Sequence, residues 1–172
     1  MSKVYFVKIH PDAVIPQRTN PTDAGMDLYS VEDIEIPPNG GRRMVSTGLK
    51  IGISPDKVNS FVIEKKIEQG DTHFPYKVGE DFVWQAEVRP RSGLAAKQGI
   101  TVLNTPGTID NGYRGELKVI MVNHEVSPFK VSKGDRIAQL VFTKSYILPI
   151  EEVQEFPDET SRGEGGFGSS GN

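Results

Sequence analysis

The clearest strand pattern in this chain is Leu117-Lys118-Val119-Ile120-Met121-Val122-Asn123, a run rich in β-branched and apolar residues. Such short runs predict strands rather than helices. Similar runs occur at residues 4–9, 82–88 and 137–143. Turn signals separate the runs, at residues 37–41, 111–112 and 133–135. Many short strands with glycine and proline between them predict an all-β sandwich, jelly roll or barrel, with one short helix expected over residues 93–97.

Length and composition narrow the class of protein. The chain has 172 residues and a formal net charge of −3, which suits one domain with a real core. Proteins that bind nucleic acid or membrane surfaces usually carry a basic excess, so we expect neither partner. Cysteine is absent, which excludes disulfides and thiolate metal sites. The sequence shows no signal-peptide or membrane-span pattern, and we therefore expect a cytoplasmic protein.

The last eleven residues form a glycine-rich tail, Arg162-Gly-Glu-Gly-Gly-Phe167-Gly168-Ser169-Ser170-Gly171-Asn172. This composition cannot form a packed structure alone. Its glycines let backbone N–H groups approach phosphate oxygens, Arg162 offers a guanidinium to a terminal phosphate, and Phe167 offers a face to a base. The tail is therefore either a solubilising disordered terminus or a segment that a phosphorylated ligand orders.

Two further segments place polar groups beside strands. Asp27 lies in a strand-like stretch, residues 22–30, where a carboxylate needs a partner such as backbone N–H or an arginine. Arg91, Ser92 and Gly93 follow a strand and open the short helix. Helix-start N–H groups, a hydroxyl and a guanidinium together suit a phosphate, although a plain turn selects the same residues.

The segment 104–116 predicts a β-hairpin with Asp110 at its tip and Tyr113 just after it. Its Asn111-Gly112 pair is typical of a hairpin turn with positive φ angles. An ordinary turn would favour the same residue types, so the hairpin alone does not establish a site. A last segment places Gln139 among apolar residues, just after a Lys-Gly-Asp turn.

Taken in order, five segments resemble the motifs of trimeric dUTPases, the deoxyuridine 5'-triphosphate nucleotidohydrolases. They are Ala-Gly-Met-Asp-Leu-Tyr-Ser at 24–30, Pro-Arg-Ser-Gly-Leu-Ala at 90–95, Gly-Thr-Ile-Asp-Asn-Gly-Tyr-Arg-Gly-Glu at 107–116, Gly-Asp-Arg-Ile-Ala-Gln-Leu at 134–140, and Arg-Gly-Glu-Gly-Gly-Phe-Gly-Ser-Ser-Gly at 162–171. The resemblance leaves out only about residues 56–80. It implies a jelly-roll-like β-clip fold and a homotrimer that exchanges its C-terminal tails, with each active site built from all three chains.

The resemblance also implies an activity, the Mg²⁺-dependent hydrolysis of dUTP to dUMP and pyrophosphate, which keeps uracil out of DNA and supplies dUMP for dTMP synthesis. A carboxylate on a rigid hairpin can position the attacking water, and we assign that role to Asp110. Tyr113 would pack under the deoxyribose and exclude a 2′-hydroxyl. Residues expected around uracil are Asn104, Gly107, Thr108, Ile109 and Lys118.

The phosphates are expected on the remaining motifs. By resemblance, the inner phosphates contact Arg91, Ser92, Gly93 and Gln139. The tail would then close over the substrate through Arg162, Phe167, Gly168, Ser169 and Ser170. Asp27 is expected to contact Mg²⁺ only through water, or to hold a neighbouring arginine. The chain thus divides into a β domain over residues 1–160 and a substrate-closing tail over residues 161–172.

Residues 56–80 depart from the resemblance. Apolar runs on both sides of Gln69-Gly70-Asp71 predict an extended hairpin arm. The arm is either a passive surface loop or a site for a protein partner or for trimer reinforcement. Two alternative functions follow: a regulatory protein that binds a partner in response to dUTP, and a dCTP deaminase, which would release ammonia instead of pyrophosphate.

Overall fold

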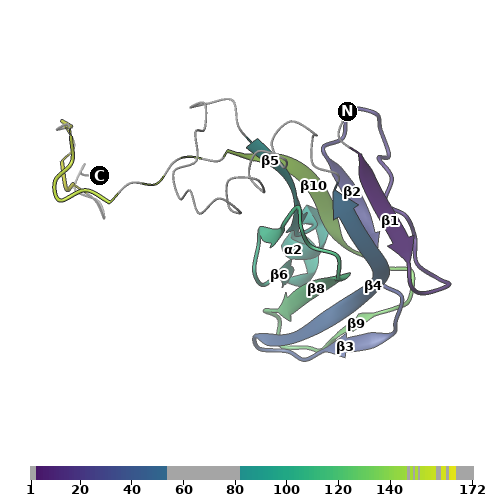
Figure 1. Cartoon of the computed structure of the whole chain (residues 1–172). Coiled ribbons are helices and arrows are strands. Elements are labelled where there is room, and N and C mark those ends of the chain that lie inside the picture. Colours follow the sequence, from purple (N-terminus) through teal and green to yellow (C-terminus); the bar gives the residue numbers. More distant parts are fainter. Residues whose placement is uncertain are drawn as a thin grey trace.

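Two four-stranded sheets make up the body of the protein (Figure 1). The computed structural model describes residues 3–53, 82–146, 148, 150, 152–157, 160–161 and 163–165. One sheet has the order β1 (Val4–Lys8), β4 (Gly41–Ile53), β8 (Glu116–Asn123) and β6 (Ile100–Val102). The other has the order β2 (Gly25–Tyr29), β10 (Arg136–Tyr146), β5 (Phe82–Arg89) and β7 (Gly107–Ile109), and a ribbon joins β3 (Ile34–Ile36) to β9 (Phe129–Val131). The all-β fold predicted from the sequence is confirmed.

Each of the four predicted apolar runs forms a strand, and in β5, β8 and β10 part of the side chains enter the core. In β8, Leu117, Val119 and Met121 are buried, whereas Glu116 and Lys118 lie on the other face of the sheet. The predicted runs correspond to β1, β5, β8 and β10, and β10 extends to Tyr146. Strand β8 therefore supplies core residues with one face and site residues with the other.

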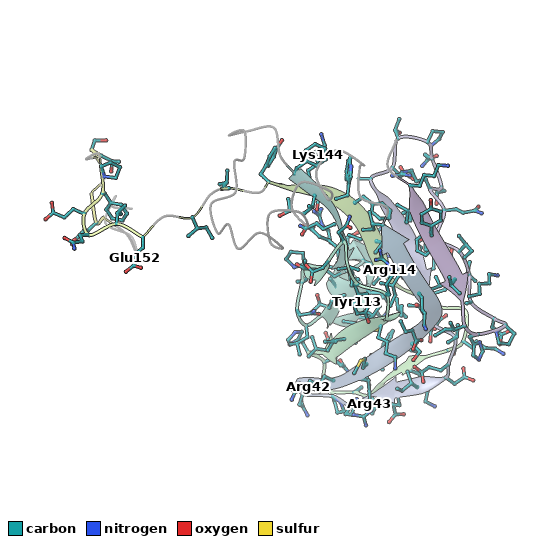
Figure 2. The ribbon with its side chains drawn as sticks, in the orientation of Figure 1. Arg42, Arg43, Tyr113, Arg114, Lys144 and Glu152 are labelled. Carbon is teal, nitrogen blue, oxygen red and sulfur yellow. The ribbon has the colours of Figure 1, made fainter. Side chains whose placement is uncertain are left out.

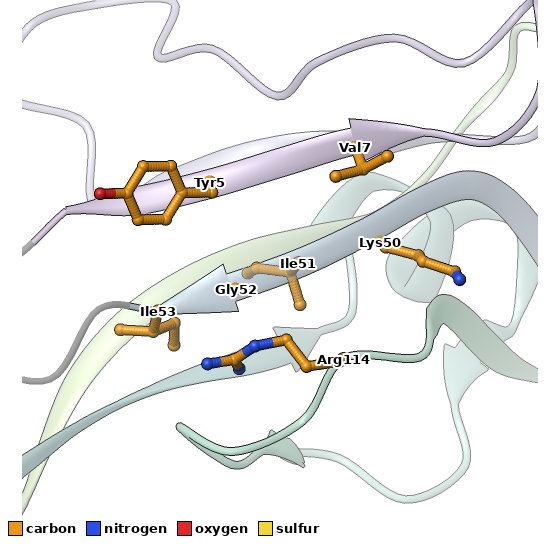
Figure 3. A pocket seen from close by; sticks show the side chains of 7 residues that line it. All are labelled: Tyr5, Val7, Lys50, Ile51, Gly52, Ile53 and Arg114. Atoms are coloured by element: carbon orange, nitrogen blue, oxygen red, sulfur yellow. The ribbon is translucent and has the colours of Figure 1, made fainter.

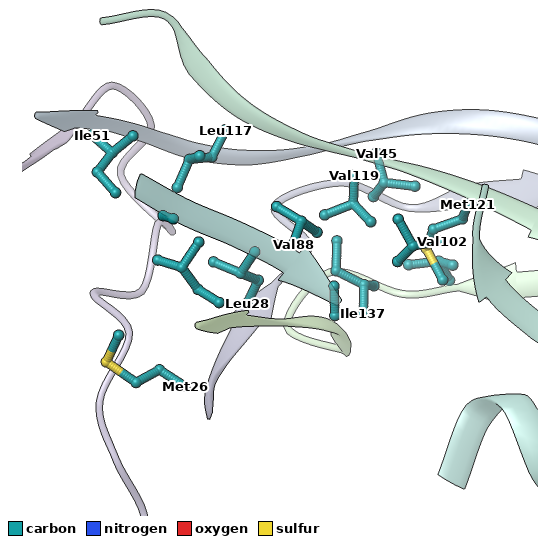
Figure 4. Close-up of a cluster of buried hydrophobic side chains, with 14 of the residues drawn as sticks. Met26, Leu28, Val45, Ile51, Val88, Val102, Leu117, Val119, Met121 and Ile137 are labelled. Atoms are coloured by element: carbon teal, nitrogen blue, oxygen red, sulfur yellow. The ribbon is translucent and has the colours of Figure 1, made fainter. Parts of the chain in front are cut away.

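The core fills the space between the two sheets (Figure 4). Leu28, Val45, Leu117 and Leu140 have no exposed surface. Burial of one such side chain contributes about 1.5–3 kcal/mol, so the apposed faces hold the sheets together. The buried members of the cluster also include Met26, Ile51, Val88, Val102, Val119, Met121 and Ile137.

The predicted hairpin over residues 104–116 is wrong in its pairing. Strand β7 pairs with β5, with Ile109 opposite Ala86, whereas β8 pairs with β4 and β6. The segment between β7 and β8 therefore crosses from one sheet to the other, and a hairpin turn is not required. Accordingly, Gly112 does not adopt positive φ. It is the pair Asn39-Gly40 that has left-handed φ angles, of 56° and 81°.

A single short helix, α2 (Ser92–Gln98), occurs within the described residues and confirms the helix predicted over residues 93–97. It ends at Gly99, which has φ of 56° and donates its backbone N–H to the Leu94 carbonyl. The helix fixes the position of Arg91, its N-cap residue, at the end of β5. The described chain contains no helix of the length and apolarity needed to cross a membrane.

Candidate active site

An open groove of about 390 Å³ lies on the outer face of β8. Three of its lining residues are among the predicted site residues, namely Ile109, Tyr113 and Lys118. Sequence reasoning missed three others: Met44, Glu116 and Ile120. Alternation along β8 places residues 116 and 120 on the face of Lys118, and this period-two signal could have identified both. We call this the Tyr113 groove.

Tyr113 is fixed by a close approach to the backbone of Gly115. Its hydroxyl donates a hydrogen bond to the Glu116 carbonyl oxygen at 2.8 Å. A Cβ atom on Gly115 would lie 2.6 Å from the Tyr113 Cζ, closer than non-bonded atoms pack, so residue 115 must be glycine for the ring to lie there. Tyr113 is still 41% exposed, which leaves it available to a ligand in the groove.

Glu116 connects the groove to an irregular part of β4. One carboxylate oxygen accepts a hydrogen bond from the Gly48 backbone N–H at 3.1 Å, and the other lies 3.4 Å from the Lys118 ammonium. Gly48 has φ of +65° and lies where the register of β4 against β8 shifts. Glu116 therefore holds both the bulge and the Lys118 side chain.

Asp110 directly follows β7, and its side chain is exposed. The turn that begins with it closes through a hydrogen bond from the Tyr113 backbone N–H to the Asp110 carbonyl, at 3.0 Å. Asn111 donates its side-chain amide to the Trp84 carbonyl oxygen at 3.2 Å. The turn is thus tied to β5, and Asp110 is exposed directly after Ile109, which lines the groove.

The rest of the predicted base site lies along β7. Thr108 pairs with Glu87, and Gly107 pairs with Val88. The Asn104 side-chain nitrogen lies close against Gly107, 3.2 Å from where a Cβ would stand. Strand β7 is the last strand of its sheet in the described order, so its second edge presents backbone donors and acceptors.

A second polar group, the Asp27 cluster, consists of Asp27, Arg91 and Arg136. The Asp27 carboxylate accepts hydrogen bonds from Arg91 Nε at 3.1 Å and from Arg136 Nη1 at 3.2 Å. Arg91 also donates to the Arg136 carbonyl oxygen at 3.2 Å. The interpretation that Asp27 holds a neighbouring arginine is confirmed. Arg136 was missed, although it lies in the segment 134–140 that was singled out.

The remaining predicted phosphate contacts lie beside this cluster. Gln139 on β10 is opposite Asp27 on β2 and opposite Arg89 on β5, and its side chain packs against Gly25. Ser92 and Gly93 are exposed at the start of α2. Two cationic guanidinium groups around one carboxylate leave a net positive charge, which suits an anion.

The structure thus brings the predicted residues together in two groups. The Tyr113 groove and the Asp27 cluster share no residue within one chain. The tail residues Arg162, Phe167, Gly168, Ser169 and Ser170 lie outside the described residues, as does the predicted arm over residues 56–80. Across the described ranges, no set of three or more His, Asp or Glu side chains is placed to hold a metal ion.

Comparison with known proteins gives a consistent result. The dUTPase family model matches residues 12–66 and 72–171, so only residues 67–71 of the predicted arm fall outside the match. A deoxyuridine 5'-triphosphate nucleotidohydrolase from Clostridioides difficile is 44% identical over 164 residues, covering 95% of this chain and 94% of the relative. Its counterpart from Wolinella succinogenes is 45% identical over 169 residues, covering 98% of this chain and 94% of the relative.

Solved structures show the same fold. The dUTPase of Staphylococcus bacteriophage 80alpha, with dUPNHPP, superposes with a TM-score of 0.75 at 23% identity, over 99% of both chains. The dUTPase of Staphylococcus aureus phage phi11 superposes with a TM-score of 0.67 at 18% identity, over 91% of this chain and 99% of that one. With the family model matched on both sides of residues 67–71 and relatives above 40% identity along almost the full length, this chain belongs to the dUTPase family.

Proposed function

We propose that this protein is a dUTP diphosphatase that hydrolyses dUTP to dUMP and pyrophosphate, keeping uracil out of DNA and supplying dUMP for dTMP synthesis. The observation that best supports this proposal is the Tyr113 groove. Its aromatic ring is held by a hydrogen bond, and the turn that follows the exposed Asp110 is tied to β5. Family membership and the names of the curated relatives point to the same reaction.

Base selection follows from the free edge of β7. Uracil presents an acceptor, a donor and an acceptor along one side, which complement backbone groups around Thr108, Ile109 and Lys118, with the Asn104 amide and Gly107 completing the site. Cytosine reverses two of these groups, and each buried group left unpaired would cost about 1–3 kcal/mol. The Tyr113 ring occupies the space under the sugar, so a 2′-hydroxyl would clash with it and UTP would bind weakly.

Asp110 carries the chemistry in this proposal. Its carboxylate accepts a proton from a water molecule as the water oxygen bonds to the α-phosphorus. The bond from that phosphorus to the bridging oxygen breaks at the same time, and pyrophosphate leaves with the bond electrons. The tether from Asn111 to the Trp84 carbonyl limits the freedom of this carboxylate.

The phosphate chain is assigned to the Asp27 cluster. Because Asp27 holds Arg91, the guanidinium is oriented before the substrate arrives, and Ser92, Gly93 and Gln139 add donors. Both Asp27 oxygens are paired with arginines, so the donor set suits a Mg²⁺ ion held by phosphate oxygens and water rather than by direct protein ligands. When bound, Mg²⁺ would neutralise part of the triphosphate charge.

We further propose a cytoplasmic homotrimer in which the two groups meet across subunits. Sharing between chains is supported by the finding that the Tyr113 groove and the Asp27 cluster have no residue in common within one chain. In this arrangement residues 1–160 form the β domain and residues 161–172 close over the substrate. Arg162 would contact the γ-phosphate, Phe167 would stack on uracil, and donors would come from Gly168, Ser169 and Ser170.

The test of the reaction is substitution of Asp110. We expect Asp110→Asn to bind dUTP within about tenfold of the wild type, with kcat reduced at least about 100-fold. Pyrophosphate and ammonia would be measured with dUTP, dCTP and UTP. Release of ammonia from dCTP would favour a deaminase, and near-normal turnover by Asp110→Asn would reject its assignment.

The regulatory alternative rests on residues 56–80 and has a separate test. Replacement of this segment by a short Asp-Gly turn should leave kcat within about threefold, since none of the five motifs lies in it. A 100-fold lower kcat in an intact trimer would instead place the segment at the active site. A dUTP-dependent complex that is lost with the segment, while hydrolysis is retained, would establish a partner-binding role.

A further inference from the structure

Arg114 lies next to the Tyr113 groove but is not one of its lining residues (Figure 2). Its Nη1 donates two hydrogen bonds to the Asp110 turn, one to the Asn111 carbonyl at 2.6 Å and one to the Tyr113 carbonyl at 2.7 Å. Both bonds come from one nitrogen, and both acceptors belong to residues that follow Asp110 within three positions. The guanidinium therefore links two backbone carbonyl groups of the turn to each other.

The Arg114 side chain is seated on the end of β4. It lines a second groove, of about 510 Å³, with Tyr5, Val7, Lys50, Ile51, Gly52 and Ile53 (Figure 3). Its Nε would lie 3.5 Å from a Cβ on Gly52, which is ordinary van der Waals contact. Gly52 is opposite Tyr5 in the β1–β4 pairing. The arginine thus connects the turn to the C-terminal end of β4.

The opposite side of the turn is tied to the other sheet. Asn111 donates to the carbonyl of Trp84 on β5, and β7 pairs with that same strand. The Asp110 turn is therefore a bridge with one anchor in each sheet, through Asn111 on one side and Arg114 on the other. Loss of either anchor removes one side-chain tie and leaves the turn held on that side only by its chain connection to β7 or β8.

We propose that Arg114 is a positioning residue for the hydrolytic step, which rests on the function proposed above. In this proposal Arg114 does not contact the substrate. It holds the Asp110 turn, and therefore the Asp110 carboxylate, in a fixed position relative to the Tyr113 groove. Small displacements of a catalytic group reduce the rate strongly. The groups assigned to the base and the phosphates lie outside the turn, and the Tyr113 ring is also held by its own hydrogen bond to the Glu116 carbonyl, so substrate binding should depend less on Arg114. The expected signature is a lower kcat with a nearly constant KM.

Because one Arg114 nitrogen makes both hydrogen bonds, two substitutions can separate the effect of these bonds from the effect of the side-chain stem. Arg114→Lys keeps one terminal nitrogen that can reach the carbonyls, whereas Arg114→Met keeps only the apolar stem. We expect kcat of Arg114→Met to fall at least about tenfold with KM within about threefold, and kcat of Arg114→Lys to stay within about threefold. Arg42→Met is the matched control, because Arg42 is exposed at the other end of β4 and should leave kcat unchanged.

Backbone hydrogen exchange tests the positioning without substrate. In Arg114→Met, peptides covering residues 110–115 should exchange faster than in the wild type, while peptides from β8 should not change. Unaltered exchange and unaltered kcat in this variant would overturn the inference, as would equal impairment of the lysine and methionine variants. If Arg114→Met does not fold, Asn111→Ala tests the opposite anchor by the same two measurements. A wild-type protein that releases no pyrophosphate would reject the proposed function alone, and the exchange result would still decide the role of Arg114.

Discussion

The close packing of Tyr113 over Gly115 leads to a prediction that separates activity from stability. In Gly115→Ala, the added Cβ would overlap the phenol ring, which would be only 2.6 Å away at Cζ. The backbone φ of Gly115 is outside the left-handed region, so alanine fits the backbone itself. The strain is therefore relieved by movement of the ring, and the bond from the Tyr113 hydroxyl to the Glu116 carbonyl is lost.

The expected change in the stability of Gly115→Ala follows from two opposing contributions. Loss of one hydrogen bond costs about 0.5–1.5 kcal/mol, and replacement of glycine by alanine at a compatible site returns about 0.4–1 kcal/mol through the unfolded state. The two nearly cancel, so Tm should change by no more than about 4 °C. The displaced ring no longer supports the sugar, and kcat/KM for dUTP should fall about fivefold to tenfold. UTP should be rejected less strongly, because the ring that is proposed to exclude its 2′-hydroxyl would have moved.

Pyrophosphate release with dUTP and UTP, together with thermal unfolding, would measure all three quantities. Gly112→Ala is the matched control, since a Cβ at Gly112 meets no atom within 4 Å and its φ is also permissive. This control should keep both its kcat/KM and its preference for dUTP. If Gly115→Ala also retains both, the Tyr113 ring does not form the sugar site and the assignment of the groove must be abandoned.

Two substitutions and one truncation test other parts of the site and fold. Asp27→Asn should release Arg91 and lower kcat/KM for dUTP about tenfold or more, measured by pyrophosphate release, and an unchanged value would show that the Asp27 cluster does not bind phosphate. A hydrogen bond from Arg89 holds the pKa of Glu87 below its ordinary value of 4.5. The ionised Glu87 therefore stabilises the fold above that pH, and this stabilisation is lost as the pH falls through the lowered pKa. Thermal unfolding should therefore show Glu87→Gln to be less stable than the wild type at neutral pH, with a difference that shrinks in acid, and a difference that grows in acid would contradict this pairing. A chain that ends at Thr160 should fold, keep the oligomeric state of the full chain by light scattering and lose most of its kcat, and full activity would argue against the proposed role of the tail as a lid.

The sequence predicted β5, β8 and β10 because each has enough apolar residues on one face to define a buried side, and it also predicted β1. It missed β4, the longest described strand with 13 residues, which has exposed arginines near its start and whose register against β8 shifts after Ser46. The three-residue strands β3, β6, β7 and β9 carry no such pattern, and their positions depend on partners distant in the sequence. The error over residues 104–116 has the same origin. Whether β7 pairs with the next strand in the chain or with β5 depends on long-range packing, which a local turn signal does not contain.

The candidate site was predictable where a sequence motif marks it. Tyr113, Lys118 and Ile109 came from the motif resemblance, and the structure places them around one groove. Met44 was not identified, because it reaches the groove only through the pairing of β4 with β8. The pairing of Arg136 with Asp27 likewise joins two strands about a hundred residues apart. Proximity of this kind is a property of the folded sheets rather than of any segment.

The alternation along β8 has a consequence for how this protein can vary in evolution. Removal of one residue from within residues 116–121 would exchange the two faces of the strand beyond the deletion, placing Lys118 or Glu116 in the core and Leu117 or Val119 in the groove. A single deletion there would destroy packing and site together, whereas single substitutions can alter one face at a time. Changes in chain length should therefore be rare inside β8 among homologues and frequent between strands, and an alignment of many homologues can count both.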